Sequence, residues 1–279
     1  MSVWHQGVSF LRHLAVAGDA HAVHSPFVFD LYRRAEAAAK PWLRQAWHPD
    51  AALAFEVAAE WKAIEAERKR LRASREVIEI QDLGAGSQVD GARRRAVGGI
   101  ARSGLLPASW CRRLAALRAA LPPGPVLELG TSLGITTAYL ASVQPASKVY
   151  TLEGCAATLA QAEAVWGRLG LQGHIYPTLG NIDDTLASVL PQGPFAMVVL
   201  DANHRAEAVL RYFEAILPHL HPQGCVVVDD IYWTPDMTAG WRALQRHAQV
   251  RQWVDLYRQG WLFARANQAA EGFVLRALG

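Results

Sequence analysis

The sequence lacks the apolar runs, leader features and cysteine pairs that would indicate a membrane or an oxidising compartment. No run approaches the about 18 uninterrupted apolar residues of a membrane span, although 51% of the 279 residues are hydrophobic. Arg12 and His13 interrupt the apolar N-terminus and no cleavage region follows, so we expect no secretory signal. The three cysteines lie far apart, without CxxC spacing, which favours reduced thiols. We therefore expect a cytoplasmic protein with no membrane partner.

An excess of charge of one sign is also missing. The net charge is +3, from 28 basic and 25 acidic residues, and this does not require a nucleic-acid partner. Basic side chains do gather in two places, at residues 69–75 and at Arg93–Arg95. Such clusters are usually solvated helix faces or loops. Binding of RNA or of a phosphate-bearing substrate remains an alternative for them.

The first third of the chain has helical periodicity and little strand pattern. One helix is expected to begin at Pro26, directly after Ser25, and a long helix is expected from an Asp50 cap through Leu71. The polar, glycine-containing stretch 88–99 predicts a connecting loop. We assign residues 1–104 to a helical N-terminal cap or substrate region.

From residue 105 onward, strand and helix patterns alternate, which is typical of a doubly wound, mostly parallel α/β sheet. The runs 250–257 and 260–264 predict a hairpin, and 272–278 is a third short run. We assign residues 105–279 to one domain, whose ligand is expected at the carboxyl ends of the strands. The expected strands are 126–130, 148–152, 174–178, 195–200 and 225–229, and the expected helices are 156–169, 182–190 and 205–220.

One strand–loop–helix segment gives the strongest indication of a ligand. The run Val126–Gly134 passes from a short apolar strand, through an acid, into a glycine-spaced turn, and a helix pattern follows from Ile135. Glycine lets a ligand approach the backbone, and a helix N-terminus offers free N–H groups. Glu153 ends the next strand 19 residues after Gly134. An acid there can accept hydrogen bonds from ribose hydroxyls, so the segment predicts a nucleoside site.

Other nucleotide-binding motifs are missing from this segment. Gly130 and Gly134 are separated by three residues, so neither the dinucleotide pattern GxGxxG nor the P-loop pattern GxxxxGK[ST] is present. A second glycine turn, Asp82–Ser87, has no following strand that ends in an acid. We interpret that turn as a loop after a short strand, or as a lid that contacts cofactor or substrate.

The pattern Glu128-x-Gly130-x-x-x-Gly134 with Glu153 resembles the S-adenosylmethionine (SAM) site of class I methyltransferases, over roughly residues 105–265. The resemblance implies SAM as cofactor and a Rossmann-like, doubly wound, mostly parallel sheet of seven strands. It implies that Glu128 contacts the amino-acid end of SAM and that Glu153 binds the ribose. Glycines that serve packing alone, with Glu153 as a solvated strand end, are the alternative. Further contacts are implied from Thr136 to the SAM carboxylate, and from Gly180, Asn181 and Ile182 to the adenine.

Two later strand ends supply acidic side chains. Asp201 follows the strand 195–200, and Asp229 and Asp230 end the next one, so the three are expected at one sheet edge. Converging carboxylates repel unless a cation compensates them, and this predicts a metal site with Mg²⁺ as the default ion. Such an ion would lower the pKa of a substrate hydroxyl, and His204 is the candidate general base. The alternative is an Asp201 that orients the SAM amino group or caps a helix, with a structural His204.

The Asp-x-x-His motif at 201–204, followed by Asp229-Asp230, resembles metal-dependent O-methyltransferases. The macrocin type is closer than the catechol type, which has a lysine in place of His204 and an asparagine in place of Asp230. The passage 21–32 also resembles uncharacterised bacterial methyltransferases. These resemblances imply SAM-dependent methylation of a small-molecule hydroxyl, with Asp201 and His204 as catalytic residues. RNA or protein methylation and a non-catalytic partner of this fold are the alternatives, and a homodimer is left open.

Overall fold

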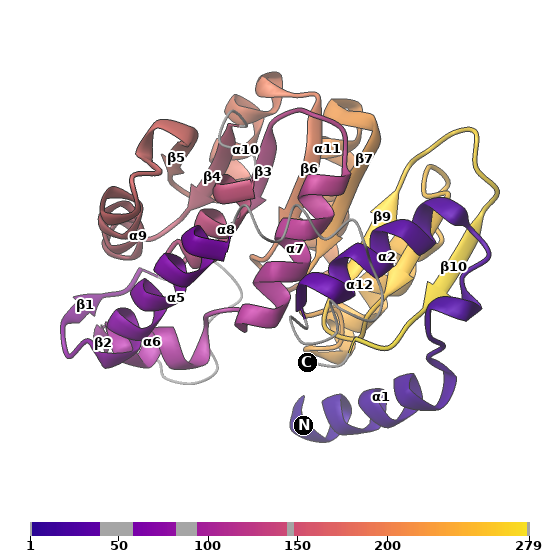
Figure 1. Cartoon of the computed structure of the whole chain (residues 1–279), viewed down its shortest axis with the longest axis horizontal. Helices are drawn as coiled ribbons and strands as arrows, with labels where there is room; N and C mark the ends of the chain where they lie inside the picture. The colour runs from indigo at the N-terminus through magenta and orange to yellow at the C-terminus, as the bar shows by residue number, and fades with distance from the viewer. Residues whose placement is uncertain (1, 40–57, 82–93, 144–147, 278–279) are drawn as a thin grey trace. The chain divides into compact units, whose positions relative to one another are not determined.

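The computed structural model, drawn in Figure 1, describes residues 2–39, 58–81, 94–143 and 148–277. The chain divides into two compact units, and each is described by itself. Unit 1 comprises Met1–Arg33, Leu121–Leu127 and Leu190–Leu278, and unit 2 comprises Arg34–Ala120 and Glu128–Val189. The expected domain boundary after residue 104 stays a prediction.

Strands of mixed direction form the centre of unit 1. The strands β6 (Phe195–Leu200) and β7 (Leu220–Val228) run parallel. All of β6 and residues 224–228 of β7 are buried, which is typical of parallel strands covered on both faces. The strands β8 (Gln252–Asp255) and β9 (Gly260–Phe263) form the predicted antiparallel hairpin, and β9 pairs with β7. At the edge, β10 (Glu271–Val274) pairs in parallel with β8.

Two helices of unit 1 begin at residue types that commonly start a helix. Helix α2 (Pro26–Ala39) begins at Pro26, as predicted, after a first helix α1 (Ser2–Val16) and the short η1 (Ala20–Ala22). Thr234 caps α12 (Pro235–Gln245) by accepting a hydrogen bond from the N–H of Met237 at 3.0 Å. Helix α11 (Ala206–Ile216) packs against α12. The remaining short helices of this unit are η4 (Leu190–Gln192) and η5 (Leu217–His219).

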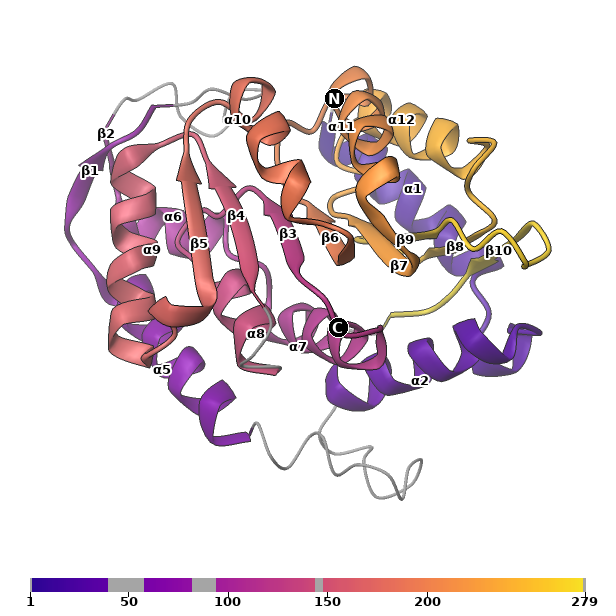
Figure 2. The same cartoon turned by 90° about the horizontal axis from the view of Figure 1, so that it is seen from above.

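Unit 2 contains the parallel strands that follow the glycine-spaced loop. The strand β3 (Val126–Leu129) begins in unit 1 and ends in unit 2, and β4 (Val149–Glu153) pairs in parallel with β5 (Ile175–Leu179). Figure 2 shows β4 and β5 side by side, with α9 (Ala156–Leu169) beside them. Helix α8 (Ile135–Val143) packs on β4, as does α10 (Ile182–Val189). A short helix, η3 (Gln172–His174), precedes β5.

The rest of unit 2 is helical, with one small hairpin. Helix α5 (Ala58–Ala73) packs on α6 (Val97–Ser103), α8 and α9, and α7 (Ala108–Ala120) packs on α8. The strands β1 (Val77–Glu79) and β2 (Arg94–Ala96) pair antiparallel. The prediction of a loop over 88–99 was wrong for residues 94–99, because β2 finds a partner strand and α6 follows. A Cβ at Gly98 would lie 2.5 Å from the carbonyl oxygen of Ser74, so this glycine lets α6 approach the end of α5.

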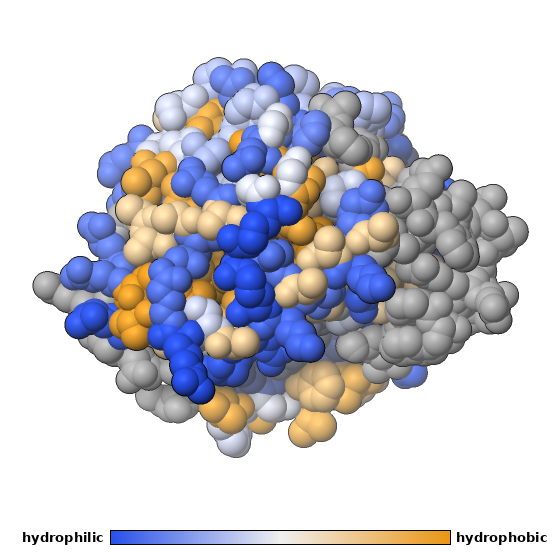
Figure 3. Space-filling model, turned by 60° about the vertical axis from the view of Figure 1, so that its left-hand side comes forward, coloured by the Kyte–Doolittle hydropathy of each residue, from blue (hydrophilic) through white to orange (hydrophobic). Residues whose placement is uncertain are grey.

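The predicted α/β sheet is confirmed, with eight strands rather than the expected seven. Its order is β10-β8-β9-β7-β6-β3-β4-β5, and the additional strand is the edge strand β10. None of the helices among the described residues is long and apolar enough to cross a membrane. Figure 3 shows one face of the molecule, where hydrophilic side chains dominate and hydrophobic ones occur in small groups. The Asp50 cap and the glycine turn Asp82–Ser87 lie outside the described residues.

Candidate functional site

Hydrogen bonds hold the loop after β3 against the C-terminal end of β4 in unit 2. The N–H of Gly130 donates to the carbonyl of Leu152 at 3.0 Å, and the N–H of Ser132 donates to Oε2 of Glu153 at 2.8 Å. Oε1 of Glu153 accepts from the N–H of Cys155 at 2.9 Å. Gly130 and Ser132 both have positive φ, at 100° and 49°, which lets the loop turn tightly around the carboxylate. Glu153 is thus held in one orientation by the backbone around it.

The turn after β5 lies next to the same strand tip. The N–H of Gly180 donates to the carbonyl of Glu153 at 2.9 Å, and Gly180 has a φ of 146°. Asn181 caps the N-terminus of α10, because its side-chain oxygen accepts a hydrogen bond from the N–H of Asp183 at 3.1 Å. Ile182 is buried. The structure therefore brings Gly130, Glu153 and the turn 180–182 together, as the nucleoside hypothesis requires.

Glu128 is an acid inside unit 2, with only 1% of its surface exposed. Its Oε2 accepts hydrogen bonds from the hydroxyls of Thr137 at 2.6 Å and Thr151 at 2.7 Å. Burial raises the pKa of Glu128 to about 7, against the opposing effect of these two hydroxyls. This acid therefore joins β3, α8 and β4, and it can carry a proton near neutral pH.

Gly134 is required by the packing of two helices. It has a φ of 74°, and a Cβ there would lie 2.6 Å from Nε1 of Trp166 and 2.7 Å from Cβ of Ala162. Nε1 of Trp166 donates to the carbonyl of Gly134 at 2.9 Å, which fixes the start of α8 against α9. Packing alone accounts for this glycine, and its predicted contact with SAM stays a prediction.

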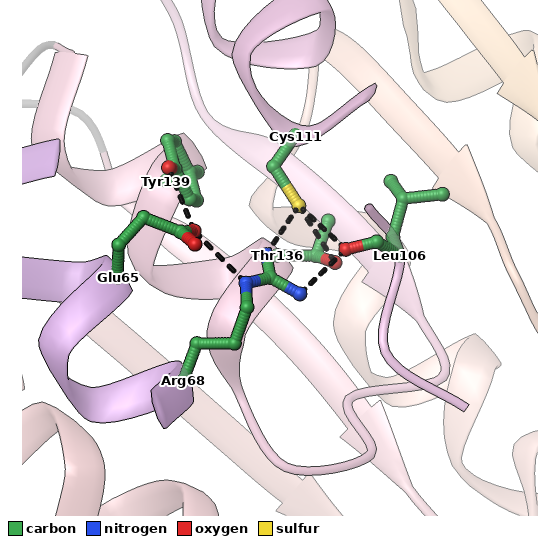
Figure 4. A network of polar contacts seen from close by, with 6 residues as sticks. All are labelled: Glu65, Arg68, Leu106, Cys111, Thr136 and Tyr139. Carbon is green, nitrogen blue, oxygen red and sulfur yellow. Dashed lines mark hydrogen bonds and ion pairs between the residues drawn. The ribbon is translucent and has the colours of Figure 1, made fainter. Parts of the chain in front are cut away.

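Thr136 lies beside a polar network that the sequence did not reveal (Figure 4). Its Oγ1 is 4.0 Å from Sγ of Cys111, and Nη2 of Arg68 is 3.3 Å from the same sulfur. Arg68 also donates to the carbonyl of Leu106 at 2.7 Å and to Glu65 at 2.9 Å.

Glu65, whose side chain is 33% exposed, also accepts from the hydroxyl of Tyr139 at 3.0 Å. Burial raises the pKa of Cys111 to about 11, so this thiol is inert at neutral pH. The role of Thr136 in holding the SAM carboxylate stays a prediction.

The predicted acidic residues of unit 1 follow β6 and β7. Nε2 of His204 is 3.8 Å from Oδ1 of Asp201, and the two side chains are 26% and 28% exposed. Asp229 is buried, and its N–H donates to the carbonyl of Leu200 at 2.9 Å, which places the two strand ends next to each other. The structure therefore confirms that β6 and β7 are neighbours. Partial burial lowers the pKa of His204, which favours the neutral imidazole that a general base requires.

A guanidinium lies among these acids. Nη2 of Arg258 is 3.6 Å from Oδ2 of Asp229 and 3.4 Å from Oδ1 of Asp230. Burial raises the pKa of Asp229, the neighbouring charge of Asp230 raises it further, and Arg258 opposes both. Arg258 lies in the turn between β8 and β9, 28 residues after Asp230. No motif or spacing in the sequence points to it.

The magnesium site predicted from the carboxylates is not confirmed. Within the part of the chain that the structure describes, no group of three or more His, Cys, Asp or Glu side chains could hold a metal ion. Asp201, Asp229 and Asp230 are therefore not confirmed as metal ligands. The donor set contains a guanidinium beside two of the three carboxylates, which disfavours a second cation there.

The two aromatic residues after the acidic pair have different environments. The hydroxyl of Tyr232 donates to Oδ2 of Asp255 at 2.7 Å, and its ring stacks on that of Tyr257 with centroids 5.3 Å apart. Tyr232 is thus a packing residue. Trp233 is 40% exposed, and its ring centroid lies 6.4 Å from that of His204. Of the two, Trp233 is the one that can contact a flat or apolar acceptor.

Comparison with known proteins identifies a methyltransferase domain, which matches residues 127–231. A protein named probable O-methyltransferase Rv1703c, from Mycobacterium tuberculosis, is 33% identical over 139 residues. The match covers 47% of this chain and 58% of the length of that relative.

Two solved structures show the same fold. Cofactor-bound Rv0187 from MTB has a TM-score of 0.53 at 21% identity, covering 81% of this chain and 96% of that one. The methyltransferase PaMTH1 of Podospora anserina, bound to S-adenosylhomocysteine (SAH), has a TM-score of 0.56 at 13% identity, covering 77% and 96%. The predicted class I methyltransferase fold is confirmed.

Proposed function

We propose that this chain, which carries a methyltransferase domain on a class I methyltransferase fold, is a SAM-dependent O-methyltransferase acting on a small molecule. The observation that carries the proposal is the geometry around Glu153. Its carboxylate is oriented by two backbone N–H groups, at the end of a parallel strand and beside the turn 180–182. The name of the curated relative supports oxygen as the methylated atom.

The residues proposed to bind SAM lie in unit 2. Each oxygen of Glu153 already accepts one backbone hydrogen bond and has a lone pair left for a ribose hydroxyl. The loop 130–134 gives close access to the backbone, and Ile182 and Asn181 are the candidates beside the adenine. Glu128 already accepts hydrogen bonds from two threonine hydroxyls. It therefore contributes to SAM binding indirectly, by stabilising the conformation of the loop or through a bound water.

The residues proposed to act on the methyl acceptor lie in unit 1. The hydroxyl proton of the acceptor passes to the neutral imidazole of His204, which leaves an oxygen nucleophile. Asp201, 3.8 Å from that ring, stabilises the imidazolium that forms. When bound, SAM would supply the methyl group for this oxygen, with its C–S bond breaking and the bonding electron pair staying on sulfur to give SAH.

The basic residues of the N-terminal third do not favour the RNA alternative. Nε of Arg70 lies 2.8 Å from Oε2 of Glu67, and the same oxygen lies 2.9 Å from Arg168. Arg68 is buried and paired with Glu65. Acidic partners on the same surface reduce the positive potential that phosphate binding needs.

The test is binding followed by turnover. SAH binding is measured by calorimetry, and a metabolite mixture is then screened for a SAM-dependent mass gain of one methyl group. We expect SAH to bind and the acceptor to be a hydroxyl compound whose methylation falls by ~100-fold or more in His204→Gln. Absence of SAH binding would refute the cofactor assignment. Salt-sensitive retention of RNA together with methylation of that RNA would refute the small-molecule acceptor.

A further inference from the structure

The acidic cluster of unit 1, defined here as Asp201, Asp229 and Asp230, contains a cation that belongs to the chain. Nη2 of Arg258 is within 3.6 Å of a carboxylate oxygen of Asp229 and within 3.4 Å of one of Asp230. The charge of Asp201 also acts on Arg258. One guanidinium therefore pairs with two members of the cluster that the sequence assigned to a metal, and the charge of the third acts on it.

The backbone that carries Arg258 is fixed on both sides. Its N–H donates to the carbonyl of Leu256 at 2.9 Å, and its carbonyl accepts from the N–H of Ile231 at 3.2 Å, directly after the acidic pair. The preceding Tyr257 has a φ of 68°, and its N–H donates to Oδ1 of Asp255 at 2.9 Å. The turn between β8 and β9 is therefore attached to the segment after β7. This attachment orders the guanidinium beside the carboxylates before any acceptor binds.

We infer that Arg258 takes the place of a divalent cation in the acidic cluster, as a positioning residue that makes the acceptor side of this chain independent of metal. The inference rests on the proposed function only in assigning the cluster to acceptor binding. A guanidinium is permanently charged and binds carboxylates through a planar fork of donors. Mg²⁺ would need near-octahedral oxygen ligands at about 2.0–2.1 Å, and it would meet the positive charge of Arg258 at two of the three carboxylates.

The arrangement also explains a difference between the two carboxylates of the acidic pair. Asp229 is buried and has Oδ1 without a hydrogen-bond partner among the described residues, and Arg258, 3.6 Å from Oδ2, is one of the groups that favour its charged form. Asp230 is 18% exposed and has a left-handed φ of 52°, and its Oδ1 lies 3.4 Å from the same nitrogen, Nη2 of Arg258. The side chain of Arg258 is 34% exposed, so it keeps a face open to an acceptor.

The test measures divalent-cation binding directly, on the full chain. The wild type, Arg258→Lys and Arg258→Ala are titrated with MgCl₂ and MnCl₂ by calorimetry and by thermal unfolding, against NaCl of equal ionic strength. We expect no binding heat and no shift for the wild type and for Arg258→Lys, which keeps a cation. We expect Arg258→Ala to gain a metal-dependent rise in Tm of ~2 °C or more, because its carboxylates lack compensation. Arg211→Ala, which removes an exposed arginine of α11, is the matched control and should behave as the wild type.

Three results would overturn the inference. They are saturable Mg²⁺ or Mn²⁺ binding by the wild type, the same binding by Arg258→Lys, and no gain of binding by a folded Arg258→Ala. If Arg258→Ala does not fold, the titrations of the wild type and Arg258→Lys still decide. SAH binding is measured on the same samples with and without EDTA. A chain that binds no SAH refutes the proposed function, whereas the metal titration tests Arg258 whether or not SAH binds.

Discussion

The acidic residues of the two units have partners of different origin. In unit 2, Glu128 and Glu153 accept hydrogen bonds from threonine hydroxyls and backbone N–H groups of the neighbouring strand ends and helix starts. In unit 1, Asp229 and Asp230 have a guanidinium from a distant hairpin turn. Neutral donors leave Glu153 able to bind hydroxyls and hold Glu128 inside unit 2, whereas the ion pairs of unit 1 neutralise charge. Acids near the ends of parallel strands can therefore serve recognition in one place and electrostatic balance in another.

The largest effect is expected from Glu153→Ala, which tests whether the acid of unit 2 recognises the cofactor. The change removes both ribose acceptors and releases the N–H groups of Ser132 and Cys155 that orient the loop. Hydrogen bonds to a charged group contribute about 1.5–3 kcal/mol each, so SAH affinity should fall ~100-fold or more. Calorimetry with SAH measures the loss.

Glu163→Ala is the matched control for that prediction. Glu163 is an exposed acid of α9, ten residues further along the chain. Its replacement should leave SAH affinity unchanged. Equal affinity of Glu153→Ala and the wild type would remove the ribose assignment.

Much of the fold and of the cofactor side could be predicted from local sequence. The strand, glycine-spaced turn and helix at 126–143 carry their own periodicity, and helix α9 was predicted with the residues it has in the structure, 156–169. Glu153 was found by its spacing from Gly134, because parallel strands end at the same edge of a sheet. What failed in the same region depends on tertiary packing. The loop expected over 88–99 is in part a strand, because β2 pairs with β1, and the contacts of Glu65 with Arg68 and Tyr139 have no local signal.

The acceptor side could be predicted only in part. Spacing identified Asp201, His204 and the acidic pair, and the structure places β6 beside β7. The sequence did not identify the compensating cation, because Arg258 comes from a turn whose position is set by pairing of β9 with β7. With three acids and no visible basic partner, Mg²⁺ was the simplest inference. A single arginine at a hairpin turn has no local pattern that distinguishes it from a solvated one.

A smaller effect is expected from Glu128→Gln, through the pH dependence of stability. Burial raises the pKa of Glu128 to about 7 from an ordinary 4.5. The protonated acid therefore stabilises the fold at low pH, and this stability is lost as the pH rises through 7. Glutamine has no such loss and can still accept from Thr137 and Thr151.

Urea unfolding at pH 5 and pH 8 measures this effect. The wild type should lose about 2 kcal/mol more than Glu128→Gln between the two pH values. Glu163→Gln, at an exposed site, should follow the wild type. Parallel losses in Glu128→Gln and the wild type would mean that Glu128 is ionised throughout this range.

The smallest effect is expected from Asp230→Asn, which tests the charge balance among Asp229, Asp230 and Arg258 in unit 1. The charge of Asp230 is the second cause, after burial, of the raised pKa of Asp229. Without that charge the pKa of Asp229 should fall, so less stability is lost as the pH rises from 5 to 8. Asparagine tolerates the left-handed φ of 52° and keeps an oxygen for Arg258.

Urea unfolding at the same two pH values should show a loss smaller than that of the wild type by ~1 kcal/mol. Asp184→Asn removes an exposed acid of α10, away from Arg258 and the acidic cluster in the sequence, and should leave the loss unchanged. A loss that grows in Asp230→Asn would mean that Asp230 stabilises the ionised Asp229 by holding Arg258 in place. Arg258 would then depend on Asp230 for its position, and the fixed turn between β8 and β9 would not be sufficient to orient it.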